Sequence, residues 1–132
     1  MLLVLLFVMI FCHVVDDYYL QGVLAKLKQK ESWPQDKPQY RHDYIAALAA
    51  HAFSWAFMIL LPLLTFGIVN NYDPLFFYVW YPCVFILNTF IHAFVDNEKA
   101  NEKSINLVTD QIIHMIQIIM TYGVFLTYVL NH

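Results

Sequence analysis

The chain has 132 residues, of which 61% are hydrophobic and 13% are charged. Soluble domains are usually about 45–50% apolar and about 25% charged, so this composition excludes a water-soluble domain and points to the lipid bilayer as the chain's partner. With seven Lys and Arg side chains and a net charge of −3, the chain lacks the basic stripe that nucleic-acid binding needs. We therefore expect no nucleic-acid partner.

Four long apolar segments predict four transmembrane helices, since each span of the bilayer takes ~20 apolar residues. The first segment has no basic n-region and no small-residue cleavage site, so we expect a retained span rather than a signal peptide. The predicted fold class is all-α: a polytopic membrane protein with an antiparallel four-helix transmembrane bundle. We expect one domain over residues 1–132, with helices over about 2–28, 40–69, 74–97 and 104–130.

Three polar breaks separate these segments. The first contains Pro34 and Pro38 and is expected to be a loop, because proline lacks an N–H and disfavours helix before it. In the second break, Asp73 is expected to cap the next helix, with Pro74 at its first position. The third break is short and charged, which predicts a tight hairpin between the last two helices.

The distribution of basic residues predicts the orientation in the membrane. The second break carries no Lys or Arg, and positive charge marks cytoplasmic connections. We therefore expect the first and third breaks in the cytoplasm and both termini on the non-cytoplasmic side. All seven basic residues flank those two breaks: Lys26, Lys28, Lys30, Lys37, Arg41, Lys99 and Lys103.

Ionisable side chains stand out against the apolar segments. Six of them form three His/Asp pairs at a spacing of four residues, which places both members of a pair on one helix face. In each pair the Asp is expected about 6 Å nearer the cytoplasm than the His. All four helices thus direct such groups to the cytoplasmic half of the bundle. The seven candidates are His13, Asp17, His51, His92, Asp96, Asp110 and His114.

These seven residues are predicted to be metal ligands. Imidazole and carboxylate together favour a divalent transition metal, zinc in first place and Fe, Mn, Ni or Co as alternatives. One ion with outer carboxylates, or two ions bridged by an Asp, would both use this set. Isolated membrane histidines more often only satisfy hydrogen bonds, and acids near helix ends are often solvated; three pairs and His51 exceed those needs.

Four further polar residues are weaker candidates. Asp16 points about 100° away from Asp17 on an α-helix. Gln21 and Gln111 continue the polar faces and could contact the ligands from outside. Lys99 could neutralise a phosphate, although a lysine snorkelling to the interface is the commoner arrangement.

The order of these motifs resembles a known family. The residues are His13, Asp17-Tyr18-x-Leu20-Gln21, a lysine at 28 or 30, His51, His92-x-x-x-Asp96-x-x-Lys99 and Asp110-Gln111-x-x-His114. The pattern is similar to domain of unknown function 3307, a family of small membrane proteins of bacteria and phages. The resemblance implies a multi-pass protein of the bacterial inner membrane without an established activity. A looser similarity links the chain to membrane-bound metal-dependent hydrolases.

The leading hypothesis is a metal-dependent hydrolase that acts on a lipid-linked or phosphate-containing substrate at the cytoplasmic leaflet. A cation would activate water, Asp17 or Asp110 would act as general base, and Lys99 would stabilise negative charge. The alternatives are a metal-ion or proton transporter and a protein with a structural metal site. Against transport, residues 2–11 and 76–87 are apolar apart from tyrosines. The sequence leaves homo-oligomers open.

Overall fold

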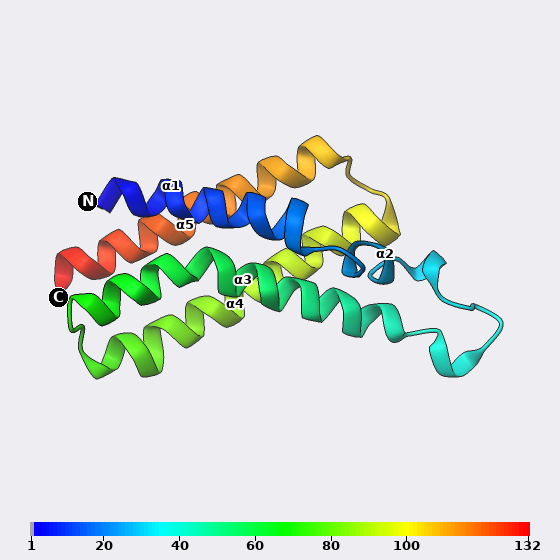
Figure 1. The fold of residues 1–132 in the computed structure, drawn as a ribbon, viewed down its shortest axis with the longest axis horizontal. Helices are drawn as coiled ribbons and strands as arrows, with labels where there is room; N and C mark the ends of the chain where they lie inside the picture. Colours follow the sequence, from blue (N-terminus) through cyan, green and yellow to red (C-terminus); the bar gives the residue numbers. More distant parts are fainter. Residues whose placement is uncertain (1) are drawn as a thin grey trace.

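The four expected spans are present as four long helical segments that run in alternating directions along the bundle (Figure 1). The structure is a computed structural model that describes residues 2–132; Met1, the first residue of the expected domain, lies outside the described residues. Within the described chain every regular element is helical, and four segments are long and apolar enough to cross a membrane, so the predicted fold class is confirmed. The four segments are Leu2–Leu20, Pro38–Val69, Phe76–Glu102 and Leu107–Asn131.

Short π-helical and 3₁₀ turns extend or connect the α-helices. A π-helical turn lies at Asp16–Leu20, Phe76–Trp80 and Glu98–Glu102, and 3₁₀ turns lie at Lys30–Ser32 and Pro38–Tyr40. The α-helices are α1 (Leu2–Val15), α2 (Leu24–Leu27), α3 (Asp43–Val69), α4 (Tyr81–Asn97) and α5 (Leu107–Asn131).

The first helix is interrupted, contrary to the expected continuous helix over 2–28. Gln21 N–H donates to the Asp16 carbonyl at 3.0 Å, which closes the π-helical turn, and Gly22 then adopts φ = +45°. Glycine takes this left-handed conformation without a steric penalty. The chain therefore leaves the axis of α1, and α2 packs against α3 as a separate segment.

The remaining boundaries differ less from the prediction. Asp73 Oδ1 accepts from the Phe76 N–H at 3.0 Å, so the predicted cap is confirmed. The helical path of α4 continues through Glu98–Glu102, a stretch that was expected to be a non-helical break. It ends at Lys103, where φ is +56°, and α5 starts after Asn106, whose side chain accepts from the Thr109 N–H at 2.9 Å.

The two ends of the bundle differ in character. Both termini and the α3–α4 turn lie at one end, which we call the terminal end (Figure 1). Residues 21–42 and 98–106 lie at the other, the connection end, where Lys30 pairs with Glu102 at 2.7 Å and Lys103 with Glu31 at 2.5 Å. The hydrophobic core fills the terminal half, with fully buried side chains at Met9, Trp55, Ile59, Leu60, Leu63, Phe76, Ile118 and Phe125.

The outer surface of the bundle is apolar. Phe7 and Phe11 on α1 and Phe90 and Phe94 on α4 are each more than 60% exposed. A soluble monomer rarely exposes contiguous apolar patches of this kind. The spans thus present an apolar exterior, and the ionisable groups His13, Asp16, His51, His92, Asp96, Asp110 and His114 lie inside the bundle.

Candidate metal centre

The structure brings all seven predicted residues together in the connection half of the bundle. A chain of close contacts links them, from His13 through Asp17, His51, His92, Asp96 and His114 to Asp110. Six are at most 1% exposed, and the side chain of Asp17 is 6% exposed. The connection end therefore holds a buried cluster of imidazoles and carboxylates built by all four spans.

The centre of this cluster is formed by three imidazoles and one carboxylate. His51 Nε2 lies 3.0 Å from His92 Nε2 and 3.1 Å from Asp96 Oδ2. His92 Nε2 lies 3.8 Å from that oxygen, and His114 Nε2 lies 3.5 Å from Asp96 Oδ1. Zinc bonds of about 2.1 Å in a tetrahedron separate the ligand atoms by about 3.4 Å. The observed spacings bracket this value.

Two overlapping groups have the spacing that a metal ion requires. Asp17, His51 and His92 form one group, and His92, Asp96 and His114 form the other, each with its ligand atoms within 4.8 Å of one another. His92 belongs to both. The ligand-type atoms therefore surround one region of the bundle rather than two separate ones.

His13 is engaged differently from the other histidines. Its Nδ1 accepts the indole N–H of Trp55 at 2.7 Å. Because a tryptophan N–H can only donate, Nδ1 carries no proton and Nε2 carries it. That Nε2 lies 3.1 Å from Gln111 Oε1, to which it donates. Both nitrogens of His13 are thus occupied by protein groups, and neither metal-type group includes it.

Asp110 lies at the edge of the cluster beside Lys99. Lys99 Nζ donates to Asp110 Oδ2 at 2.6 Å, and Gln111 Nε2 donates to the same oxygen at 3.0 Å. The other oxygen, Oδ1, is buried, has no hydrogen-bond partner, and lies 3.3 Å from His114 Nε2. The side chain of Lys99 is 26% exposed, so it links the cluster to the surface.

Lys28 is a residue of the cluster that the sequence analysis missed as a site residue, since it was counted among the basic residues that flank the first break. It is 3% exposed and forms an ion pair with Asp96. The break at Gly22 returns the chain to the bundle, and this places Lys28 inside it. Its signal in the sequence was its place among the motifs of the family resemblance, as the lysine at 28 or 30.

Asp16 also belongs to the cluster, although α-helical geometry predicted that it would point away. It is 1% exposed, accepts from Ser54 Oγ at 2.6 Å, and approaches His51 Nδ1 at 3.9 Å. The π-helical turn widens the helix at this point, so that Asp16 and Asp17 both face the interior. The α-helical assumption is the reason for the wrong expectation.

Two glutamines hold Asp17 in place. Gln21 Nε2 donates to its Oδ1 at 3.3 Å, and Gln111 Nε2 donates to its Oδ2 at 3.2 Å. Gln21 also lies 3.3 Å from His51 Nε2. The expected contacts of both glutamines with the candidate ligands are present.

Aromatic rings close the cluster toward the terminal end. Trp55 stacks on His92 with ring centroids 4.1 Å apart, and His92 stacks on His114 at 4.2 Å. Behind them lie Met9 and Ile59, both fully buried. These rings therefore separate the cluster from the hydrophobic core at the terminal end.

Comparison with known protein families gives a match over most of the chain. The family described as Protein of unknown function (DUF3307) matches residues 5–132, nearly the whole chain. Neither a search of curated proteins nor a search of solved structures finds a match.

Proposed function

Because the chain belongs to the DUF3307 family, as its motifs predicted, and the family description names no activity, we propose a function from the buried cluster. The chain is an integral membrane protein that binds a divalent transition-metal ion and uses it to hydrolyse a lipid-linked or phosphate-containing substrate. One observation carries the proposal: inside the bundle, the Nε2 atoms of His51, His92 and His114 each lie 3.1–3.8 Å from a carboxylate oxygen of Asp96, and those of His51 and His92 lie 3.0 Å apart.

Charge supports a divalent cation at this place. The cluster contains four carboxylates, those of Asp16, Asp17, Asp96 and Asp110. Two ammonium groups pair with them, Lys28 with Asp96 and Lys99 with Asp110. If the imidazoles are neutral, the cluster carries a net charge of −2. Uncompensated charge within a membrane is costly. One divalent ion would neutralise the cluster.

Unsatisfied polar atoms support it as well. His114 Nε2 and Asp110 Oδ1 are buried without a hydrogen-bond partner, and two Nε2 atoms, of His51 and His92, face each other at 3.0 Å. Buried polar atoms are normally paired, and a cation satisfies several lone pairs at once. The donor set of imidazole and carboxylate favours zinc, with Fe, Mn, Ni or Co as alternatives.

We assign the ligands to His51, His92, His114 and Asp96, with Asp17 as a further carboxylate donor. A single ion is the simpler arrangement, because His92 is common to both groups and its Nε2 binds one cation at a time. A two-ion centre bridged by Asp96 is the alternative. His13 is assigned to holding Gln111 in place, since both of its nitrogens are already hydrogen-bonded.

Two further charged residues, Asp110 and Lys99, are assigned to the reaction. A divalent cation acts as a Lewis acid toward a phosphoryl or carbonyl oxygen. Asp110 keeps one oxygen free of donors and would accept a proton as general base. Lys99, the partly exposed cation, would bind the anionic group of the substrate. Asp17 could serve as base only by leaving its glutamine partners, so we assign it to the ligands.

A groove beside the cluster favours a lipid-linked substrate. It has a volume of about 420 Å³, opens on the outer surface between Tyr18 and α5, and reaches Gln111, whose amide contacts Asp17 and Asp110. An apolar chain lying there would place its polar group near Lys99. The other lining residues are Leu107, Val108, Ile112, Met115 and Ile116.

Hydrolysis fits the cluster better than transport does. A conduit would have to pass the stacked rings of Trp55, His92 and His114 and then the core behind them. An enzyme needs only the approach from the connection end.

Metal analysis tests the proposal first. The protein purified in detergent is expected to contain one zinc ion per chain by emission spectrometry, and H51A/H114A is expected to contain none. H42A, which changes an exposed histidine outside the cluster, is the matched control and should keep the ion. A metal-free wild type that takes up no added zinc, Fe, Mn, Ni or Co would refute the metal site.

Turnover is tested with a long-chain alkyl nitrophenyl phosphate in mixed micelles. Release of nitrophenolate is expected for the zinc-loaded wild type, with loss in D110N and with zinc content unchanged in that variant. A bound ion without turnover would indicate a structural site instead. If the wild type carries zinc or protons across proteoliposome membranes and H51A/H114A does not, transport would replace hydrolysis as the proposed function.

We propose a bacterial inner membrane as the location, because the family resemblance implies it, and both termini on the non-cytoplasmic side, because the basic residues flank the first and third breaks. With Cys12 and Cys83 replaced by alanine, single cysteines at Asn70 and Asp36 report the two sides. An impermeant maleimide added to intact cells should label N70C and not D36C. The opposite labelling would reverse the orientation.

A further inference from the structure

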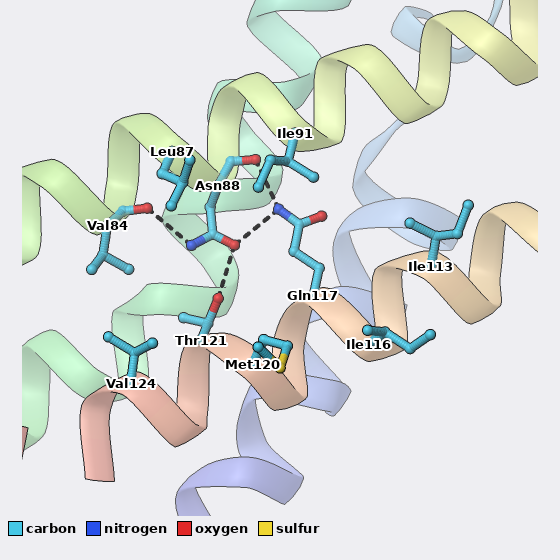
Figure 2. A pocket seen from close by; sticks show the side chains of 10 residues that line it. All are labelled: Val84, Leu87, Asn88, Ile91, Ile113, Ile116, Gln117, Met120, Thr121 and Val124. Atoms are coloured by element: carbon cyan, nitrogen blue, oxygen red, sulfur yellow. Dashed lines mark hydrogen bonds between the residues drawn. The ribbon is translucent and has the colours of Figure 1, made fainter. Parts of the chain in front are cut away.

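A second buried polar network lies next to the metal ligands. Asn88, Gln117 and Thr121 are only 3%, 7% and 6% exposed, at the floor of an apolar groove of about 390 Å³ between α4 and α5 (Figure 2). Asn88 lies four residues before His92, and Gln117 three residues after His114. At these spacings residues share a helix face, so the network lies one helical turn from two of the imidazoles.

The hydrogen bonds of this network have a defined direction (Figure 2). Thr121 Oγ1 and Gln117 Nε2 both donate to Asn88 Oδ1, at 3.0 and 2.9 Å, and Gln117 Nε2 also donates to the Asn88 carbonyl at 3.0 Å. Asn88 Nδ2 donates to the Val84 carbonyl at 2.9 Å. The amide of Gln117 is thus held by its NH₂ group, and its Oε1 is buried without a partner.

An unsatisfied nitrogen lies on the same helix face. His114 Nδ1 is also buried without a hydrogen-bond partner. When Nε2 of a neutral imidazole binds a metal, the proton is on Nδ1, which becomes a donor. Metal-bound histidines nearly always donate this N–H to an outer acceptor. Helical side chains lean toward the N-terminus, so Gln117 reaches back toward the turn that carries His114.

We propose that Gln117 is a positioning residue that orients His114 by accepting its Nδ1–H, directly or through one buried water. The contact satisfies two buried atoms at once, and a polar site between them is suited to a bridging water. Asn88 and Thr121 fix the amide so that its oxygen, and not its NH₂ group, faces the histidine. This inference rests on the proposed metal site and assigns Gln117 a role in it.

The test compares two substitutions of similar size. Q117M removes the acceptor, whereas Q117E keeps an acceptor oxygen. Zinc affinity is measured by competition with a chromogenic chelator. Loss of such outer partners typically weakens metal binding about 10–100-fold, so this weakening is expected for Q117M and less than about threefold weakening for Q117E. T127V, on the exposed face of α5, is the control and should bind zinc as the wild type does.

A second measurement separates this inference from the proposed function. The ¹⁵N shifts of the His114 ring in metal-free protein should show a protonated Nδ1 in the wild type and in Q117E, and a partly deprotonated Nδ1 in Q117M. Zinc binding by the wild type decides the metal site, and the proton on His114 Nδ1 decides the contact with Gln117. An unprotonated Nδ1 in the metal-free wild type, or unchanged zinc affinity in Q117M, would overturn the positioning role.

Discussion

Lys28 and Asp96 form a buried ion pair between residues that are 68 positions apart in the chain. The same carboxylate oxygen of Asp96 lies 3.1 Å from His51 Nε2. The lysine ammonium and a metal ion would therefore draw on one acceptor. Lys28 supplies positive charge to the cluster from a segment outside the four spans, and its removal should make the fold depend on added metal.

K28M is accordingly expected to destabilise the metal-free protein. Removing one partner of a buried pair leaves an uncompensated charge and typically costs about 3–5 kcal/mol. Excess zinc should restore most of this stability, because the cation replaces the lost charge. Unfolding is followed by circular dichroism with and without zinc, with the exposed-site variant K37M as control. A K28M protein as stable as the wild type without zinc would contradict the compensating role of Lys28.

W55F is expected to destabilise the cluster more than W80F destabilises the terminal end. The change removes the indole N–H that donates to His13 Nδ1 at 2.7 Å and leaves a buried acceptor unpaired, which costs about 1–3 kcal/mol. Trp80 packs in the aromatic layer with Phe76 and Phe125, so W80F controls for the loss of ring size. Equal losses of unfolding free energy in the two variants would show that the hydrogen bond to His13 does not contribute to stability.

The contribution of the α3–α4 turn to the stability of the protein should depend on pH. The Tyr128 hydroxyl donates to Asp73 at 2.7 Å, and together with the Phe76 N–H it holds the pKa of the Asp73 carboxyl below its usual value. A carboxyl whose pKa is lower in the folded state stabilises the fold above its unfolded pKa of about 3.9. This contribution is lost as the pH falls through the folded pKa.

D73N should therefore lower the melting temperature at pH 6, and the difference from the wild type should shrink as the pH falls below about 4. Melting is followed in detergent across this range. D36N, at an exposed loop position, is the control and should leave the melting temperature unchanged at every pH. A D73N difference that is constant with pH would mean that the charge of Asp73 contributes nothing.

Gly22 and Gly123 predict opposite effects of the same substitution. Gly22 has φ = +45°, and its added β-carbon would meet only the Leu20 carbonyl, at 3.8 Å. G22A is thus expected to cost about 1 kcal/mol, through backbone strain alone. Gly123 lies within α5 with nothing near its added β-carbon, so G123A should stabilise by about 0.5–1 kcal/mol. Stabilisation by G22A would show that the break after α1 is not required.

The spans and the convergence of the seven ionisable residues could be predicted from the sequence. Apolar length defines the spans, and the four-residue spacing of His and Asp defines the faces. Lys28 and Asp16 could not be placed in this way. The apolar pattern continues through Leu20 and Leu24, and the one local signal for a break is Gly22. Glycine is also common inside transmembrane helices, so this signal alone does not end the first helix, and spacing gives no sign of the π-helical turn before it.

The hydrogen bonds that occupy both ring nitrogens of His13 were equally hidden from the sequence. Its spacing from Asp17 equals that of the other pairs, and only the side-chain orientation of Trp55, on another helix, occupies its Nδ1. Which histidines are free for a metal is decided by such contacts between helices, not by spacing along one helix.

The π-helical turn at Asp16–Leu20 shifts the phase of the first span. An α-helix rotates by about 100° per residue, so neighbouring residues face different directions. A π-helical turn holds one residue more than an α-helical turn, so the residues after it are shifted in phase by about 100°. Removing one residue from this turn would restore the α-helical phase, and Asp16 and Asp17 would then face different directions. The turn thus lets two consecutive acids enter the same buried site.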